Sequence, residues 1–165
     1  MNKKILSISL SLILLSCTSR KYISDPLVYE VYNRIHGDGH RLTKNHFLYK
    51  RVSTTHEGIL DDKLHKLINS GAISKSDSIS FKLDYSNSQD SCWNKKEMRN
   101  TRIIGRFAFR YLKRRRTSFS SKPYFNKEKD KALYETLWNI EQISNIYYLE
   151  KVNGKWEIKD EFQGL

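Results

Sequence analysis

The sequence predicts an α+β domain in which N-terminal helices pack on a C-terminal antiparallel β-meander. From residue 25 onward apolar residues recur at helical spacing, whereas the C-terminal third is rich in aromatic and β-branched side chains. The 165 residues include 10 Tyr, 7 Phe and 3 Trp but only 7 Gly and 2 Pro, a composition typical of a packed core. Residues 25–165 have the length of a single domain.

The first predicted helix begins at Asp25, a good N-cap residue, and Pro26 suits the first helical position. Gly37 ends the pattern, as glycine often does at a helix C-terminus. One face of this segment is apolar and is expected to face the core: Leu27, Val28, Val31, Tyr32 and Ile35.

Three elements follow in the middle of the chain. Residues 47–52 fit a strand, and residues 61–69 fit a short helix that ends before Gly71. Residues 79–85 alternate apolar and polar side chains and so predict a strand, although Ser76 and Asp77 could equally cap a helix there.

A third helix is predicted from residue 103, with an apolar face toward the core and cationic residues at its end. The apolar set is Ile103, Ile104, Phe107, Ala108, Tyr111 and Leu112. The opposite side carries Arg106, Arg110, Lys113 and Arg114.

The meander is predicted from four strand-like segments, residues 118–125, 132–139, 145–151 and 155–159. Asn153-Gly154 separates the last two, and this dipeptide is the strongest short signal for a hairpin turn. Trp156 alternates with Ile158 in the last strand, and this pattern predicts that Trp156 faces the helices and is buried.

The N-terminus has the pattern of an export signal. Lys3 and Lys4 precede an eleven-residue apolar run, residues 5–15, that is interrupted only by serines. At about 1.5 Å per residue this run covers roughly half of a hydrocarbon core about 30 Å thick. Residues 1–16 are therefore predicted to be a signal peptide rather than a membrane span.

Leu14-Leu15-Ser16-Cys17 resembles the lipobox of bacterial lipoproteins. The resemblance implies cleavage before Cys17, alkylation of its thiol with diacylglycerol, and acylation, for example with palmitate, of the new amino group. Residues 17–24 would then be a lipidated tether, and the protein would be anchored in the bacterial cell envelope, on the periplasmic face of the outer membrane. Cys92 would be the one remaining cysteine, a packed thiol; the alternative is a Cys17–Cys92 disulfide in an unlipidated secreted protein.

The predicted mature chain is strongly basic, because the formal net charge of +12 falls only to +10 when Lys3 and Lys4 leave. Export makes nucleic acid an unexpected partner, so the available polyanions are anionic lipids and acidic glycans of the envelope. An envelope protein is a further candidate partner, but a solvated basic face with no specific partner is the interpretation that the sequence favours. The candidate polyanion-binding residues are Arg106, Arg110, Lys113, Arg114, Arg115, Arg116 and Lys122.

A second resemblance lies in the C-terminal half. SFSSKPYFNKEKDKAL and IYYLEKVNGKWEI resemble a group of small bacterial envelope lipoproteins to which no activity is assigned. The terminal Asn-Gly-Lys-Trp-x-Ile also resembles the end of NTF2-like α+β domains, which implies helices packed on a curved antiparallel sheet. The matching positions are Ser118, Phe119, Ser120, Pro123, Phe125, Asp130, Lys131, Ala132, Leu133, Tyr147, Leu149, Lys151, Gly154, Trp156 and Ile158.

Candidate chemistry is sparse. His36 and His40 flank Asp38 and support a metal hypothesis, but a helix C-cap and turn is the favoured explanation because no third ligand follows at a recognisable spacing. Asp61-Asp62 and Asp160-Glu161 are paired carboxylates that capping and solvation explain. No catalytic residue, metal ligand set or cofactor is assigned. The sequence therefore favours a lipid-anchored binding, inhibitor or accessory domain over the alternative, an exported hydrolase or metal-dependent enzyme with an unrecognised site.

Overall fold

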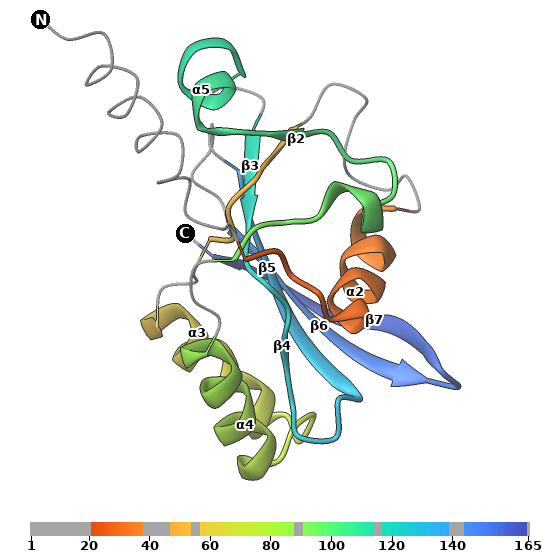
Figure 1. Cartoon of the computed structure of the whole chain (residues 1–165). Helices are drawn as coiled ribbons and strands as arrows, with labels where there is room; N and C mark the ends of the chain where they lie inside the picture. Colours follow the sequence, from red (N-terminus) through yellow and green to blue (C-terminus); the bar gives the residue numbers. More distant parts are fainter. Residues whose placement is uncertain are drawn as a thin grey trace, which may run out of the picture.

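The computed structural model describes residues 21–37, 47–53, 57–87, 91–113, 117–138 and 144–164. The predictions about the signal peptide, Cys17, His40 and Arg114, Arg115 and Arg116 lie outside these residues. The α+β class is confirmed: helices dominate the first half of the described chain, and a sheet occupies the second half (Figure 1).

Seven strands form one sheet within the described residues, in the order β2-β1-β3-β5-β6-β7, with β4 also paired to β5. β5, β6 and β7 are the predicted antiparallel meander, and β3 adds to it antiparallel. β1 pairs in parallel with both β2 and β3, which the sequence did not predict. The strands are β1 (Phe47–Tyr49), β2 (Ile103–Ile104), β3 (Thr117–Ser120), β4 (Tyr124–Phe125), β5 (Lys131–Trp138), β6 (Ser144–Val152) and β7 (Lys155–Gly164).

Helices cover both faces of this sheet, α2 on one side and α3 with α4 on the other (Figure 1). Alternation along the central strands divides the side chains between two cores, because successive residues of a strand point to opposite faces. In β6, Tyr147 and Leu149 belong to the α2 core, whereas Ile146 and Tyr148 belong to the core under α3 and α4.

The first predicted helix is confirmed as α2 (Pro26–His36). The side chain of Asp25 accepts a hydrogen bond from the backbone N–H of Leu27 at 3.0 Å, as expected of an N-cap. The domain extends a little further toward the N-terminus than predicted, because Ile23 is buried in the α2 core and pairs with Cys92 through its backbone.

The next predicted helix is also confirmed, and α3 (Glu57–Asn69) begins four residues earlier than expected. The strand prediction for residues 79–85 is wrong, because α4 (Lys75–Ser86) occupies this segment. A capping box between Ser74 and Asp77 starts the helix, and Phe81 alone among the alternating apolar residues is fully buried. Ile79 and Leu83, which share one helical face, are 62% and 59% exposed.

The hairpin prediction is confirmed at β6 and β7. Asn153 and Gly154 have φ angles of 50° and 77°, the left-handed values that a type I′ turn requires at both central positions. Trp156 faces α2 and is 4% exposed, as predicted. Ile158 pairs with Leu149 on the same face of the sheet, but it is 42% exposed and does not belong to the α2 core.

The predicted core-facing helix from residue 103 is wrong. Ile103 and Ile104 form β2 instead, since they pair with Leu48 and Tyr49 of β1. After Gly105 the chain makes a short turn of helix, α5 (Arg106–Ala108), and a π-helical turn, η2 (Phe109–Lys113). Parallel strand pairing therefore takes the first two members of the apolar pattern into the sheet and leaves the rest outside it.

Candidate functional site

The segment from Arg106 to Lys113, formed by α5 and η2, is called the aromatic tip. Phe109 attaches it to the sheet, because the Phe109 ring lies 5.2 Å from that of Tyr49 and 5.3 Å from that of Phe119. The rings of Tyr49 and Phe119 are themselves 5.3 Å apart. Three half-buried aromatic side chains thus hold the tip against β1 and β3.

Two other aromatic side chains of the tip point outward. Phe107 is 71% exposed and Tyr111 is 63% exposed, and their ring centroids lie 4.9 Å apart. The guanidinium carbon of Arg110 lies 5.6 Å from the centroid of the Tyr111 ring. Adjacent exposed aromatic side chains with cationic neighbours are characteristic of surfaces that contact a partner or a membrane interface.

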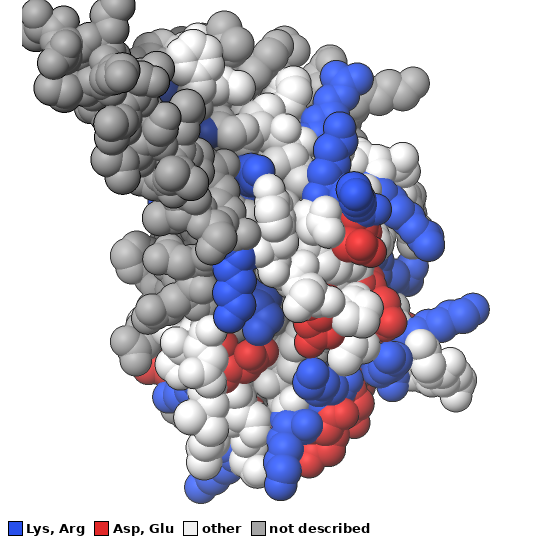
Figure 2. Space-filling view, in the orientation of Figure 1, with Lys and Arg blue, Asp and Glu red and all other residues white. Residues whose placement is uncertain are grey.

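The charged residues that flank the aromatic tip in the sequence have one sign. Residues 98–127 contain ten Lys and Arg residues and no Asp or Glu. The candidate polyanion-binding residues include only part of this stretch, so its lack of acidic residues is an additional signal in the sequence. Arg102, Arg106 and Arg110 are exposed in the structure. On the face shown in Figure 2, acidic side chains are visible over the middle and lower parts of the molecule, away from α5 at its upper end.

Lys122 does not belong with these cations. Its Nζ donates a hydrogen bond to Asp84 of α4 at 3.1 Å, and the backbone N–H of Phe125 donates to the same carboxylate at 2.9 Å. This pair attaches the segment before β4 to α4, a helix that lies at the opposite end of the molecule from α5 (Figure 1). Of the candidate cations whose side chains are described, the structure brings Arg106 and Arg110 together and separates Lys122.

The N-terminal end of the described chain lies beside the strands from which the aromatic tip emerges. Lys21 and Ile23 pair with Cys92 through backbone hydrogen bonds of 3.0 Å. Tyr22 accepts a hydrogen bond from Lys50 Nζ at 2.9 Å, and the backbone N–H of Lys50 donates to Ile104 at 3.0 Å. Cys92 in turn pairs with Arg51, so the chain enters the domain near the end of β1, and β2, which pairs with β1, leads into the tip.

The remaining cysteine and histidine candidates are part of the core where they are described. Cys92 is buried, and its backbone forms isolated β-bridges with Tyr22 and Arg51. His36 Nε2 lies 3.0 Å from the hydroxyl of Tyr134, and its ring packs against Tyr32. Burial raises the pKa of both phenols, so they stay protonated and act as hydrogen-bonding groups.

The described residues place no full set of candidate metal ligands around His36. Within the described residues no cluster of three His, Cys, Asp or Glu side chains could hold a metal ion, and the predicted second imidazole, His40, lies outside them.

The paired carboxylates have structural partners. Asp61 forms an ion pair with Lys82 at 2.8 Å and so links α3 to α4. Asp62 pairs with Lys66 one helical turn on, at 3.1 Å. Asp160 accepts a hydrogen bond from the backbone N–H of Glu161. The predicted capping role is wrong, because Asp61 and Asp62 lie inside α3 and Asp160 and Glu161 lie inside β7. Ion pairs with lysines engage Asp61 and Asp62 instead.

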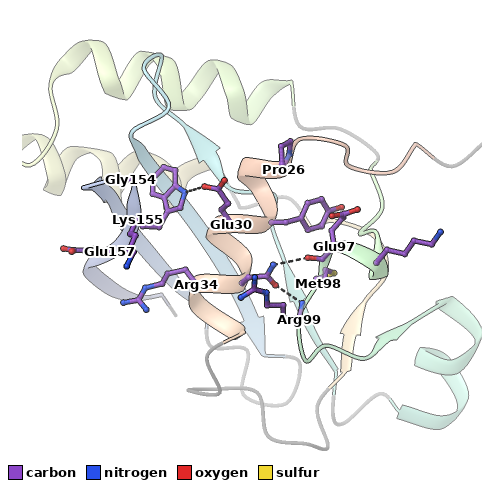
Figure 3. A pocket seen from close by; sticks show the side chains of 13 residues that line it. Pro26, Glu30, Arg34, Glu97, Met98, Arg99, Gly154, Lys155 and Glu157 are labelled. Atoms are coloured by element: carbon purple, nitrogen blue, oxygen red, sulfur yellow. Dashed lines mark hydrogen bonds between the residues drawn. The ribbon is translucent and has the colours of Figure 1, made fainter.

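An open groove of about 900 Å³ lies between α2, the 3-10 turn η1 (Lys95–Glu97) and the β6–β7 turn (Figure 3). Glu30 forms part of its wall and accepts hydrogen bonds from Trp156 Nε1 at 3.2 Å and Lys151 Nζ at 3.4 Å. Both signs of charge line the groove, so it does not select a ligand by charge. Its charged residues are Glu30, Arg34, Lys96, Glu97, Arg99, Lys155 and Glu157.

Comparison with known proteins found no matching family model, curated protein or solved structure. No helix in the described part of the chain is both long and apolar enough to span a bilayer.

Proposed function

We propose that this protein is a lipid-anchored domain of the bacterial cell envelope that holds its aromatic tip against an anionic membrane surface. It acts there as a binding or accessory domain. The observation that carries the proposal is the position of Tyr22: the predicted tether from Cys17 enters the domain near the end of β1, and the strand paired with β1, β2, leads into the tip.

The tether is short enough to restrict the orientation of the domain. Five Cα–Cα steps separate Cys17 from Tyr22, and a fully extended chain spans at most about 3.6 Å per residue. Tyr22 is therefore held within about 18 Å of an anchor at Cys17. The part of the domain that includes Lys50, β2 and the aromatic tip lies nearest to the bilayer.

Electrostatic attraction supports the same orientation. Each Lys or Arg close to an anionic bilayer contributes about 1 kcal/mol, and the effect fades over a Debye length of about 8 Å at physiological ionic strength. The exposed Arg102, Arg106 and Arg110 lie in a stretch of sequence without acidic residues. A bilayer rich in anionic headgroups therefore attracts this end of the domain.

The anchor is tested by Cys17→Ala. The precursor of this variant should stay uncleaved at residue 17, and the intact mass of the wild-type mature protein should show acyl chains on an N-terminal Cys17. A mature protein that starts elsewhere and carries no acyl chain contradicts the lipid anchor.

The surface is tested with a version that begins at Thr18 and so keeps every described residue. It should bind vesicles that contain phosphatidylglycerol at low salt, and the binding should weaken steeply toward 0.5 M NaCl. Arg106→Gln with Arg110→Gln should reduce binding by about tenfold or more. The matched control, Lys75→Gln with Lys127→Gln, removes the same charge from exposed residues of α4 and the β4–β5 turn and should have a smaller effect. Equal losses in both variants contradict the assigned surface.

A further inference from the structure

We infer that Phe107 and Tyr111 insert into the interfacial region of the anionic bilayer and give the domain a second attachment point besides Cys17. The inference rests on the proposed function and adds to it an apolar contact that charge alone does not supply.

The geometry of the aromatic tip separates an inward ring from two outward rings. Phe109 packs on Tyr49 and Phe119, so the backbone of the tip is attached to the sheet. Phe107 and Tyr111 flank Phe109 in sequence and lie on the exposed side, with their rings 4.9 Å apart. An aromatic side chain has only two rotatable side-chain bonds, so it loses little conformational entropy when it enters a membrane interface.

The chemistry of the tip fits the headgroup region better than the hydrocarbon centre. Phenylalanine contributes apolar area, and tyrosine combines an apolar ring with a hydroxyl that stays near water. Arg106 and Arg110 lie beside these rings and can contact lipid phosphates while the rings are buried. The occupant that this combination fits is a bilayer with anionic headgroups.

A second exposed apolar pair provides an internal comparison. Ile79 and Leu83 of α4 are almost as exposed as the tip aromatics. Their charged neighbours have both signs and are paired, since Asp84 pairs with Lys122 and Lys82 pairs with Asp61. This pair matches the tip in exposed apolar side chains but lies on α4, outside the proposed membrane surface, and it serves as the matched control.

Insertion also determines which parts of the domain stay in water. α5 and the β6–β7 turn lie at opposite ends of the molecule (Figure 1). A tip in the bilayer therefore directs the groove beside Trp156 away from the membrane, where it is accessible to other envelope components.

The first experiment measures binding of the Thr18 version to phosphatidylglycerol-containing vesicles by co-sedimentation. Phe107→Ser with Tyr111→Ser should weaken binding by at least about tenfold. The two substitutions remove apolar surface that would leave water on binding, and each 1.4 kcal/mol of lost binding free energy raises the dissociation constant tenfold. The control, Ile79→Ser with Leu83→Ser, should bind as the parent does. Thermal unfolding of all variants establishes that they are folded. Folding is expected because the four substituted side chains are largely exposed.

The outcomes separate the inference from the proposed function. If the aromatic variant binds like the parent while Arg106→Gln with Arg110→Gln loses binding, the surface is purely electrostatic and insertion is wrong. If the parent itself does not bind, the proposed membrane surface is wrong as well. If the Ile79 and Leu83 control loses binding equally, the membrane contacts α4 and the assignment of the tip is overturned.

A second experiment measures insertion directly. Phe107→Trp should show fluorescence that is quenched by lipids brominated near the headgroup end of their acyl chains. Ile79→Trp should not gain quenching over the parent, whose own three tryptophans set the background. Equal quenching of the two variants, or none in Phe107→Trp while the protein is vesicle-bound, contradicts insertion.

Discussion

The β6–β7 hairpin and the aromatic tip contain the same kinds of residue but differ in what covers them. Trp156 of the hairpin is 4% exposed, whereas Phe107 of the tip is 71% exposed. Both belong to apolar patterns in the sequence. A pattern indicates which side chains share a face, but it does not indicate whether another element packs on that face.

The contacts of the two aromatic residues show the same difference. The Trp156 ring lies 5.8 Å from that of Phe125, and its Nε1 donates to Glu30, so it joins β7 to β4 and α2. Phe107 contacts Tyr111 within its own segment. Stability at the hairpin depends on contacts between distant parts of the chain, whereas the outward face of the tip contributes little to it.

The largest expected effect is at the hairpin. Trp156→Ala removes a buried indole from the α2 core and should lower the free energy of unfolding by about 3 to 5 kcal/mol. Chemical denaturation measures this loss. An unchanged midpoint would mean that α2 does not pack on Trp156, and the contrast between hairpin and tip would no longer hold.

A polar network adds a second, pH-dependent contribution on the opposite face of the sheet. Partial burial alone would raise the pKa of Asp77, but hydrogen bonds from Asn126, Ser74 and Lys131 outweigh it and hold the pKa well below its usual range. Asp77→Asn should therefore cost about 2 to 3 kcal/mol at neutral pH.

The sign of the pH effect follows from the lowered pKa. Ionised Asp77 stabilises the fold at pH values above the ordinary pKa of 3.8, and this stabilisation is lost as the pH falls below it. The difference in unfolding free energy between the parent and Asp77→Asn should be constant from pH 5 to 7 and shrink toward pH 3. A difference that grows on acidification would contradict the assigned direction.

An intermediate effect is expected where the tip meets the sheet. Phe109→Ala removes a half-buried ring from the cluster with Tyr49 and Phe119 and should cost about 1 to 2 kcal/mol. Amide hydrogen exchange should accelerate in Arg106–Lys113 more than in β6 and β7. Uniform acceleration throughout the sheet would show that the tip is not a separate unit of stability.

The smallest effect is expected at the outward face. Phe107→Ala should change the unfolding free energy by less than about 0.5 kcal/mol, because the side chain is largely exposed in the folded protein. The same denaturation experiment measures it beside Trp156→Ala. A loss above 1 kcal/mol would place Phe107 in a packed environment and remove the basis for membrane insertion.

Local signals predicted several elements correctly. Asp25, Pro26 and Gly37 mark the limits of α2, and Asn153-Gly154 marks the β6–β7 turn. Such signals depend on backbone geometry and on hydrogen bonds between near neighbours, which the sequence specifies directly. The α4 segment shows their limit: alternation suggested a strand, but the capping box from Ser74 to Asp77 begins a helix.

The candidate site was predicted only in part. The cationic stretch is visible in the sequence, but the separation of Lys122 depends on Asp84, which lies 38 residues earlier in the chain. The exposure of Phe107 and Tyr111 depends on the parallel pairing of β1 with β2, which places Ile103 and Ile104 in the sheet. No local pattern specifies a pairing between residues that lie more than 50 positions apart.

The sequence by itself determined the α+β class, the limits of α2, the terminal hairpin and the basic character of residues 98–127, because each follows from local propensity, turn geometry or composition. The tertiary structure alone decided which apolar faces are covered. It buried Trp156 under α2, drew Ile103 and Ile104 into the sheet, and left Phe107 and Tyr111 exposed. The physical reason is that burial requires a second surface, and the position of that surface depends on contacts between distant parts of the chain.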